Sequence, residues 1–236
     1  MSYDPNEYRR AADDDIYMPP QQKEAVRTAS FINKVYGLMT LGLFLTAFIA
    51  HSVFFYVPLE TLAKIIIPCL IAEIILVLVL SVAVTKLSAM AALICFIGYA
   101  ALNGITLSTL FYSYHIGSIA KAFFITGGTF GLMSLYGLVT KRDLTSWGNL
   151  LLMGLLGLIV TGLVNMFLHS SALELITSVF GIIIFVGLTA YDTQKIKKIN
   201  DMGIDHGGVA VIAALSLYLD FINLFLYILR FTGRRK

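Results

Sequence analysis

The sequence predicts an all-α, polytopic membrane protein of seven transmembrane helices, and three observations lead to this fold class. Of the 236 residues, 58% are hydrophobic and only 13% are charged, whereas soluble domains carry about a quarter charged residues. Charged residues divide the chain into apolar stretches of about the length that crosses a bilayer. Some of these stretches nevertheless contain an acidic residue, which is rare in a membrane helix.

The composition also excludes several classes of protein. The net charge is only +3 and no basic stripe is interleaved with aromatic residues, so we expect no nucleic-acid partner. Cys69 and Cys95 lie inside apolar stretches, which is typical of packing residues rather than of a disulfide or a metal site. The chain contains no P-loop, GxSxG, HExxH or CxxC motif. We therefore expect neither an enzyme nor a bound cofactor.

Each predicted span is an apolar stretch bounded by charged residues. A helix needs roughly 20 apolar residues to cross the hydrocarbon. In chain order, the bounded stretches are 34–60, 64–86, 86–121, 121–141, 143–174, 174–192 and 205–230. The second contains Glu73, the seventh contains Asp220, and the sixth is short. Tyr56, Tyr136 and Trp147 lie at the edges of their stretches, as expected for an interfacial aromatic belt.

The domain organisation follows from these stretches. Residues 1–30 are polar, include Asp13-Asp14-Asp15 and lack the apolar core of a signal peptide. We expect them to form a disordered cytoplasmic tail. Residues 31–232 form one seven-helix transmembrane domain that contacts membrane lipid, and residues 233–236 form a basic C-terminal end.

Basic residues predict the orientation in the membrane. The N-terminal tail and the connections after the second, fourth and sixth spans carry most of them, whereas the connections after the first, third and fifth carry only Lys64 and Lys121. The positive-inside rule therefore places the N-terminus in the cytoplasm. The basic C-terminal end contradicts this pattern if seven helices all cross. Either the last segment is re-entrant, or its packing overrides the charge bias.

Asp220 is the strongest candidate for a functional side chain. It lies near the middle of the last apolar stretch, and Ser216, Asp220 and Asn223 recur at the spacing of one helix face. Placing an aspartate at the bilayer centre costs roughly 2.5–3.5 kcal/mol. This polar face therefore cannot meet lipid, which predicts that the last helix is surrounded by the others. The structural alternative is a buried aspartate held neutral by hydrogen bonds.

Two further acidic residues lie in predicted spans. Asp192 ends the sixth stretch, and its structural alternative is an ion pair with Lys195, three residues on. Glu73 lies in the middle of the second stretch, with no charged residue within eight positions on either side. Its alternative is a structural, protonated glutamate. Intramembrane acids of this kind indicate ion or proton pathways.

Two segments near the C-terminus resemble a known family. Tyr191-Asp192, followed by Gln194-Lys195-Ile196, and the run Leu-Tyr-Leu-Asp-Phe-Ile-Asn-Leu-Phe at 217–225 are similar to the closing signatures of the transmembrane BAX-inhibitor-motif (BAX inhibitor-1-like) family. The resemblance extends from about Val35 to Phe231 and includes Glu73 and the Lys-Arg-Asp-Leu loop at 141–144. The chain is most similar to the bacterial branch, because it lacks a long proline-rich N-terminal extension.

The resemblance implies a fold, an activity and a location. The fold is seven helices, the last inside a ring of six, in the bacterial inner membrane. The activity is a pH-sensitive calcium leak, or a cation/proton exchange, in which Asp192 and Asp220 form a hydrogen-bonded pair that senses protons and meets the calcium ion, with Glu73 as a secondary pore acid. A basic residue after the second helix is thought to latch this pair. Only Lys86 matches here, and lysine lacks the bidentate fork of arginine. Lys86 is equally typical of a positive-inside loop.

A mechanism follows if the two aspartates lie within hydrogen-bond distance. Two such carboxylates cannot both ionise cheaply, so they share one proton and titrate as a unit. Calcium takes carboxylate oxygens, so calcium ions and protons would compete for the same atoms. We therefore expect acid and calcium to act in opposition.

Two alternative functions are weighed against this one. Some bacterial members of the family are known as modulators of a membrane-bound AAA protease, and the polar N-terminal tail would then serve as the handle for such a partner. An intramembrane aspartyl protease also uses two membrane aspartates and a Tyr-Asp pair. Its second aspartate follows Gly-x-Gly, whereas Asp220 follows Leu-Tyr-Leu, so the sequence disfavours a protease.

Overall fold

A computed structural model describes residues 19–82, 88–201 and 207–236 of the chain. Seven helices in these residues are long and apolar enough to cross a membrane. The elements in chain order are α2 (Pro20–Tyr56), α3 (Leu59–Val82), α4 (Ala89–Leu107), the short α5 (Leu110–Ser113), α6 (Ile116–Val139), α7 (Thr145–Leu168), α8 (Ser171–Asp201) and α9 (Gly207–Thr232). The predicted fold class of seven transmembrane helices is confirmed.

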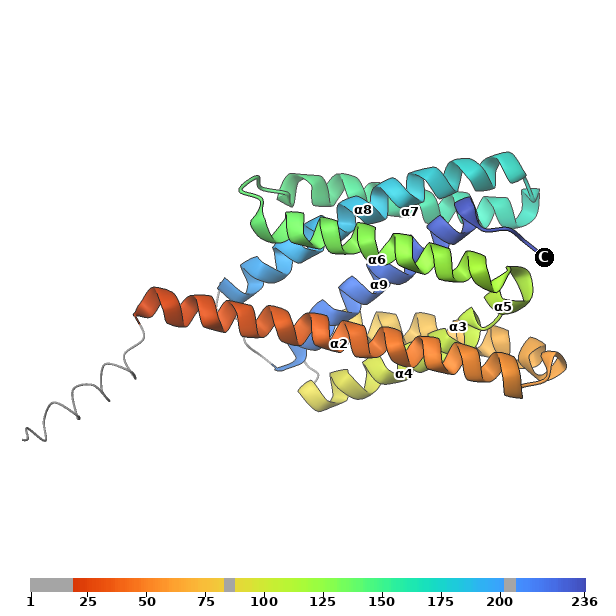
Figure 1. Cartoon of the computed structure of the whole chain (residues 1–236), viewed down its shortest axis with the longest axis horizontal. Coiled ribbons are helices and arrows are strands. Elements are labelled where there is room, and N and C mark those ends of the chain that lie inside the picture. The colour runs from red at the N-terminus through yellow and green to blue at the C-terminus, as the bar shows by residue number, and fades with distance from the viewer. Residues whose placement is uncertain (1–18, 83–87, 202–206) are drawn as a thin grey trace, which may run out of the picture.

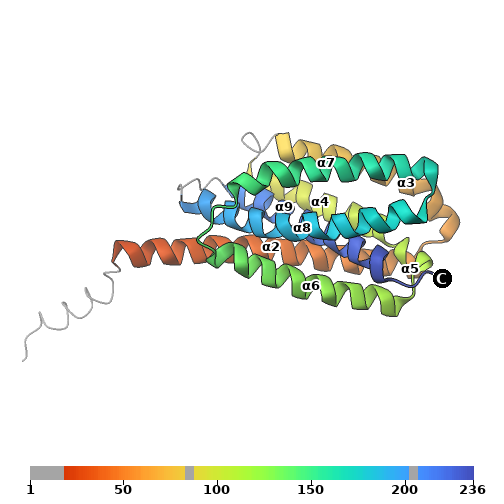
Figure 2. The same ribbon diagram turned by 90° about the horizontal axis from the view of Figure 1, so that it is seen from above.

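Helix α9 lies at the centre of the bundle and is the most buried of the seven (Figure 1). It packs directly against α2, α4, α6 and α8, while α3 packs mainly on α4, and α7 mainly on α8. Viewed from above, α9 lies between these neighbours (Figure 2). The prediction of a central last helix is therefore confirmed, and a polar residue on α9 can avoid lipid on every side.

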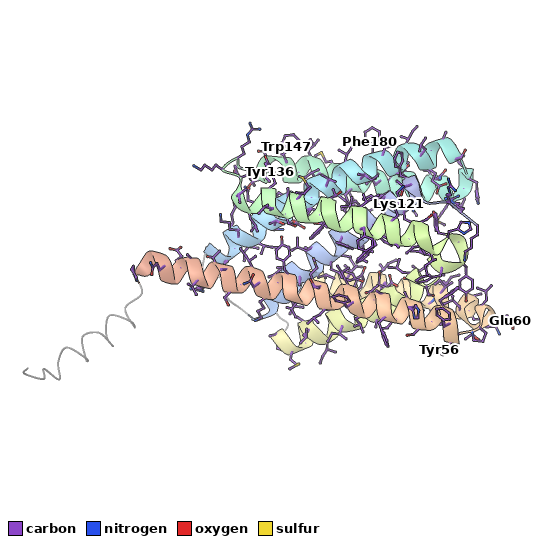
Figure 3. All side chains as sticks on the ribbon, viewed as in Figure 1. Tyr56, Glu60, Lys121, Tyr136, Trp147 and Phe180 are labelled. Atoms are coloured by element: carbon purple, nitrogen blue, oxygen red, sulfur yellow. The ribbon has the colours of Figure 1, made fainter. Side chains whose placement is uncertain are left out.

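The two ends of the bundle can be told apart by where the chain begins and ends. We call the N-terminal end the one at which α2 begins and at which residues 140–144 join α6 to α7. The C-terminal end carries residues 57–58, 108–115, 169–170 and 233–236. Figure 3 shows Tyr136 and Trp147 at the N-terminal end and Tyr56 and Glu60 at the opposite end. Exposed aromatic side chains thus mark both ends, as an aromatic belt requires.

The last segment crosses the whole bundle and is not re-entrant. Helix α9 has 26 residues, enough for about 39 Å at 1.5 Å per residue. Its end is fixed to the connection between α5 and α6, because the Lys236 amide donates to the Ser113 carbonyl at 3.0 Å and the His115 amide donates to the Arg234 carbonyl at 3.3 Å. The basic residues 233–236 therefore lie at the end opposite to the start of α2.

Two helices are longer than the apolar stretches from which we predicted them. Helix α2 has 37 residues and begins at Pro20, so residues 20–30, which we assigned to a disordered tail, are helical. It extends beyond the other helices at its N-terminal end (Figure 1). Helix α8 has 31 residues and continues through the charged residues after Asp192 to Asp201. The charged residues therefore do not mark where these helices stop.

Candidate functional site

The two predicted aspartates lie on neighbouring helices. Asp220 is in the middle of α9 and is 4% exposed, whereas Asp192 lies on α8 and is only partly buried. The two helices pack against each other. The structure thus places the two acids on packed neighbouring helices.

The Asp220 carboxyl group is incompletely bonded. Its Oδ2 atom is buried and has no hydrogen-bond partner among the residues that the structure describes. A buried polar atom without a partner costs roughly 1–3 kcal/mol. Such an atom in the central helix is therefore available to a proton, a cation or a water molecule.

Ser216 and Asn223 share the helical face of Asp220 but do not support its carboxyl group. The Asn223 amide donates to the Leu219 carbonyl of its own helix at 2.8 Å. Ser216 is partly buried, and no hydrogen bond joins it to Asp220 within the described part of the chain. The three residues lie along one face of α9, as their spacing predicts, but within the described residues neither Ser216 nor Asn223 bonds to the Asp220 carboxyl group.

Lys195 does not neutralise Asp192 by a direct ion pair. Within the described residues, the salt bridges shorter than 4.0 Å involve Asp143 and Glu174, and none joins Lys195 to Asp192. The Lys195 ammonium group lies 5.9 Å from the centre of the Tyr191 ring instead. The alternative of a local ion pair for Asp192 therefore finds no support in the geometry. The proposed latch, Lys86, lies outside the described residues, as does the Asp13-Asp14-Asp15 segment.

Glu73 forms a separate polar site between α3 and α4. Its side chain is 8% exposed. Asn103 donates its Nδ2 hydrogen to Oε2 at 3.1 Å, and Thr106 donates its hydroxyl hydrogen to Oε1 at 2.9 Å. Each carboxyl oxygen thus has a donor from α4, which accounts for a buried acid in the middle of α3.

A tyrosine of the central helix extends this site. The Tyr218 hydroxyl donates to Asn103 Oδ1 at 3.3 Å and lies 2.7 Å from the Thr46 hydroxyl of α2. Its ring is fully buried, edge-on to Phe96 and to Tyr99 with centroid distances of 5.7 and 5.9 Å. We call Glu73, Asn103, Thr106, Tyr218 and Thr46 the Glu73 network. It joins α2, α3, α4 and α9.

The part of α8 that follows Asp192 is clamped to the connection between α6 and α7. The Gln194 side chain accepts from the Leu144 amide at 2.9 Å and donates to the Arg142 carbonyl at 2.9 Å. Lys198 forms an ion pair with Asp143 at 2.5 Å. The hydrogen bond from Lys198 lowers the pKa of Asp143 to about 2, and hydrogen bonds from Thr145 act in the same direction.

Close helix contacts fix the same segment of α8 from two sides. A Cβ atom on Gly137 of α6 would lie 2.5 Å from the Ala190 carbonyl oxygen, and one on Gly148 of α7 would lie 2.6 Å from the Tyr191 ring. The Thr193 hydroxyl is 3.0 Å from the Tyr36 hydroxyl of α2. The backbone that carries Asp192 is therefore held by α2, α6 and α7.

Sequence reasoning missed several of these residues. Gln194 belongs to the signature that we quoted, but nothing in one sequence shows that its side chain spans to residues 142 and 144. Tyr218 belongs to the other signature that we quoted, but the partners of its hydroxyl could not be predicted, and Thr46 gave no signal beyond a hydroxyl within an apolar stretch. Asn103 and Thr106 are polar residues within a predicted span, and both form interhelical hydrogen bonds with Glu73.

Comparisons with known proteins agree with this architecture. The family model described as "Inhibitor of apoptosis-promoting Bax1" matches residues 28–236. The chain is 46% identical over 217 residues to the "Inner membrane protein YbhL" of Escherichia coli K12, covering 88% of this chain and 92% of that protein. It is 43% identical over 234 residues to an uncharacterized protein of Borreliella burgdorferi, covering 94% and 99% respectively. An uncharacterized membrane protein of Streptococcus pyogenes is 39% identical over 213 residues, covering 86% and 92%.

Proposed function

The chain belongs to the BAX inhibitor family and to its bacterial branch, and on that premise we propose that it is a pH-sensitive calcium leak channel gated by Asp192 and Asp220. The inner membrane of a bacterium is the proposed location, since a relative that is 46% identical is named as an inner membrane protein. The observation that carries the proposal is the Oδ2 atom of Asp220, which is buried in the central helix without a hydrogen-bond partner among the described residues, next to the helix that carries Asp192.

The proposed gate works through one shared proton. Two neighbouring carboxyl groups in a low-dielectric interface favour a state with one proton between them. The shared proton bridges α8 and α9 and keeps the passage closed. When the proton leaves, repulsion between the two carboxylates favours separation of the helices or capture of a cation.

Calcium is the cation that fits these ligands. It prefers carboxylate and carbonyl oxygens and takes about six to eight of them. The described residues bring no third His, Cys, Asp or Glu to this pair, so most of the coordination would come from water and backbone oxygens. Weak, partly hydrated binding is what passage requires, because a permeant ion must leave as readily as it enters.

Glu73 is proposed as a second acidic station of the pathway. Its carboxyl oxygens are held by Asn103 and Thr106, so Glu73 is positioned more rigidly than Asp220. Tyr218 and Asp220 are two positions apart on α9 and therefore lie on opposite faces of it. A movement of α9 at the aspartate pair would thus also act on the Glu73 network.

The N-terminal end of the bundle is proposed to lie in the cytoplasm. The described residues at this end include Lys141 and Arg142, and Lys195, Lys197 and Lys198 lie at the same end of α8. The positive-inside rule favours this orientation. Reporter fusions at the two termini test it, because alkaline phosphatase is active only outside the cytoplasm and should be active only on the C-terminal fusion.

Calcium flux in liposomes tests the proposed function. The protein is reconstituted around a calcium dye, and influx is measured at several pH values for wild type, Asp192→Asn and Asp220→Asn. We expect wild-type flux to fall with acid, and each variant to lose most of this pH dependence. Glu60→Gln is the matched control, since Glu60 is an exposed acid at the C-terminal end (Figure 3). Wild-type flux that is absent or independent of pH would contradict the proposal.

A further inference from the structure

A polar cavity of about 490 Å³ lies at the C-terminal end of the bundle, away from the aspartate pair. Helices α7, α8 and α9 and the connection after α5 form its walls. Its charged and polar lining residues include Asn165, His169, Glu174, Arg230 and Arg235. The proposed leak mechanism makes no use of this cavity, and one of its residues, Arg235, belongs to the basic C-terminal end that contradicts the positive-inside rule.

The cavity holds two guanidinium groups for one carboxylate. Arg235 forms an ion pair with Glu174 Oε1, and Arg230 Nε lies 3.7 Å from the same oxygen. At 3.7 Å, Arg230 is beyond hydrogen-bond distance, and it forms no hydrogen bond with any other described residue. One positive charge and most of the guanidinium hydrogens are therefore left unmatched.

Aromatic rings hold both guanidinium groups in place. The Arg230 guanidinium lies 5.3 Å from the centre of the Tyr227 ring, and that of Arg235 lies 5.9 Å from the centre of the Tyr114 ring. These are cation–π distances. Glu174 contributes by lying between the two arginines, which would otherwise repel each other. The arginines are thus organised before any ligand arrives.

The other polar groups of the cavity also favour a negative ligand. Asn165 uses its Oδ1 atom to accept from the Ser170 amide at 3.0 Å, so its amide hydrogens are left for another acceptor. The Thr177 hydroxyl donates to its own helix. A cation would face two arginines and a single carboxylate, whereas an anion would meet several free donors.

The depth of the cavity matches the lipid headgroup region. It reaches along α7 to Gly162, and α7 ends at Leu168. Six residues of helix correspond to about 9 Å, which is comparable to the roughly 5–8 Å thickness of each headgroup region of a bilayer. Arginine is suited to phosphate because its planar fork makes two parallel hydrogen bonds.

We propose that this cavity binds a phosphate group, supplied by a phospholipid headgroup or by free phosphate, at the guanidinium hydrogens of Arg230 and Arg235 that Glu174 leaves free. The bound anion compensates the positive charge that the single carboxylate leaves unmatched. The basic C-terminal end is then explained as part of a ligand site.

Binding measurements on the full-length protein test this proposal. Delipidated protein in detergent is titrated with phosphatidylglycerol, followed by native mass spectrometry, and separately with inorganic phosphate, followed by calorimetry. The double variant Arg230→Gln/Arg235→Gln removes both guanidinium groups. Its matched control, Lys121→Gln/Arg234→Gln, removes two charges whose side chains do not line the cavity.

A second pair of variants tests the cavity without changing charge. Gly162 lines it, and a Cβ atom there would meet nothing within 4 Å, so Gly162→Phe fills the space. Gly157→Phe is the control, because Gly157 has equally open surroundings on the same helix but does not line the cavity. If the arginine variant does not fold, the two glycine variants still test whether the ligand binds in this cavity.

We expect the wild type and both controls to bind, and the arginine and Gly162 variants to bind at least about tenfold more weakly, as the loss of charge-assisted hydrogen bonds implies. Binding of phosphatidylglycerol alone identifies a headgroup as the source. Binding of inorganic phosphate with the same dependence on the variants identifies free phosphate. Absence of both, or equal loss in variants and controls, would overturn the site.

Discussion

The hydroxyl of Tyr218 on the central helix lies 2.7 Å from the hydroxyl of Thr46 on α2 and donates to Asn103 at 3.3 Å. This one side chain joins three helices at a fully buried point. It also lies two positions from Asp220, so the alignment of α9 at the aspartate pair depends on it.

Tyr218→Phe should destabilise the bundle, because it removes the hydroxyl and keeps the ring. Interhelical hydrogen bonds in membranes contribute on average about 0.6 kcal/mol and at most about 1.7. We expect a loss within this range in unfolding by a denaturing detergent. Tyr56→Phe is the control, since Tyr56 is 84% exposed, and it should change stability little. Equal effects of the two substitutions would contradict the assigned role of Tyr218.

Glu73→Gln should be less harmful than Glu73→Leu. Glutamine keeps one acceptor oxygen but replaces the other with an amino group, which cannot accept from Asn103 or Thr106. Leucine leaves both donors unmatched, and a buried unmatched group costs roughly 1–3 kcal/mol. The free energies of unfolding of the two variants measure the difference. If leucine proves as stable as wild type, the Glu73 network does not contribute to stability.

Gly137→Ala should separate α6 from α8, because the new methyl group would lie 2.5 Å from the Ala190 carbonyl oxygen. Overpacking of this kind costs roughly 1–3 kcal/mol. Gly128→Ala on the same helix meets nothing within 4 Å and should be neutral or slightly stabilising. Thermal unfolding of both variants in detergent checks this, and the reverse order would contradict the packing of α6 on α8.

The ion pair of Asp143 with Lys198 should contribute stability that disappears in acid. The hydrogen bond from Lys198 lowers the pKa of Asp143 to about 2, whereas the pKa of an aspartate in an unfolded chain is about 3.9. A lowered pKa stabilises the folded state above about pH 4, and this contribution is lost as the pH falls from about 4 to 2. The thermal midpoint of Asp143→Asn should therefore lie below that of wild type at pH 6 and converge with it near pH 2. A constant difference across this range would contradict the linkage.

The number of helices could be predicted from the sequence because charged residues are excluded from the hydrocarbon. The ends of α2 and α8 could not be, since a helix can continue through charged residues once it has left the membrane. Lys195 and Lys198 lie in α8 for this reason. The central position of α9 could be predicted from the polar face that carries Ser216, Asp220 and Asn223, because such a face cannot meet lipid.

The hydrogen-bond and packing partners of the site residues could not be predicted from the sequence. Asn223 has the spacing to assist Asp220 but bonds to its own backbone, which an asparagine in a helix can always do. Gly127 and Gly131 form a GxxxG pattern, which is typical of close helix packing, yet a Cβ atom at either would meet nothing within 4 Å. Gly137 and Gly148, which form no such pattern, make the close contacts. The partner that faces a residue across the bundle is set by the whole fold.

The infrared difference spectrum produced by calcium tests the shared proton of Asp192 and Asp220 most directly. If calcium displaces that proton, wild-type protein should lose a protonated carboxyl band on calcium addition, and acid should restore it. The band should be absent from the spectrum of Asp220→Asn and present in that of Glu60→Gln. A wild-type spectrum in which calcium leaves the carboxyl bands unchanged, or an Asp220→Asn spectrum identical to that of wild type, would contradict the gate.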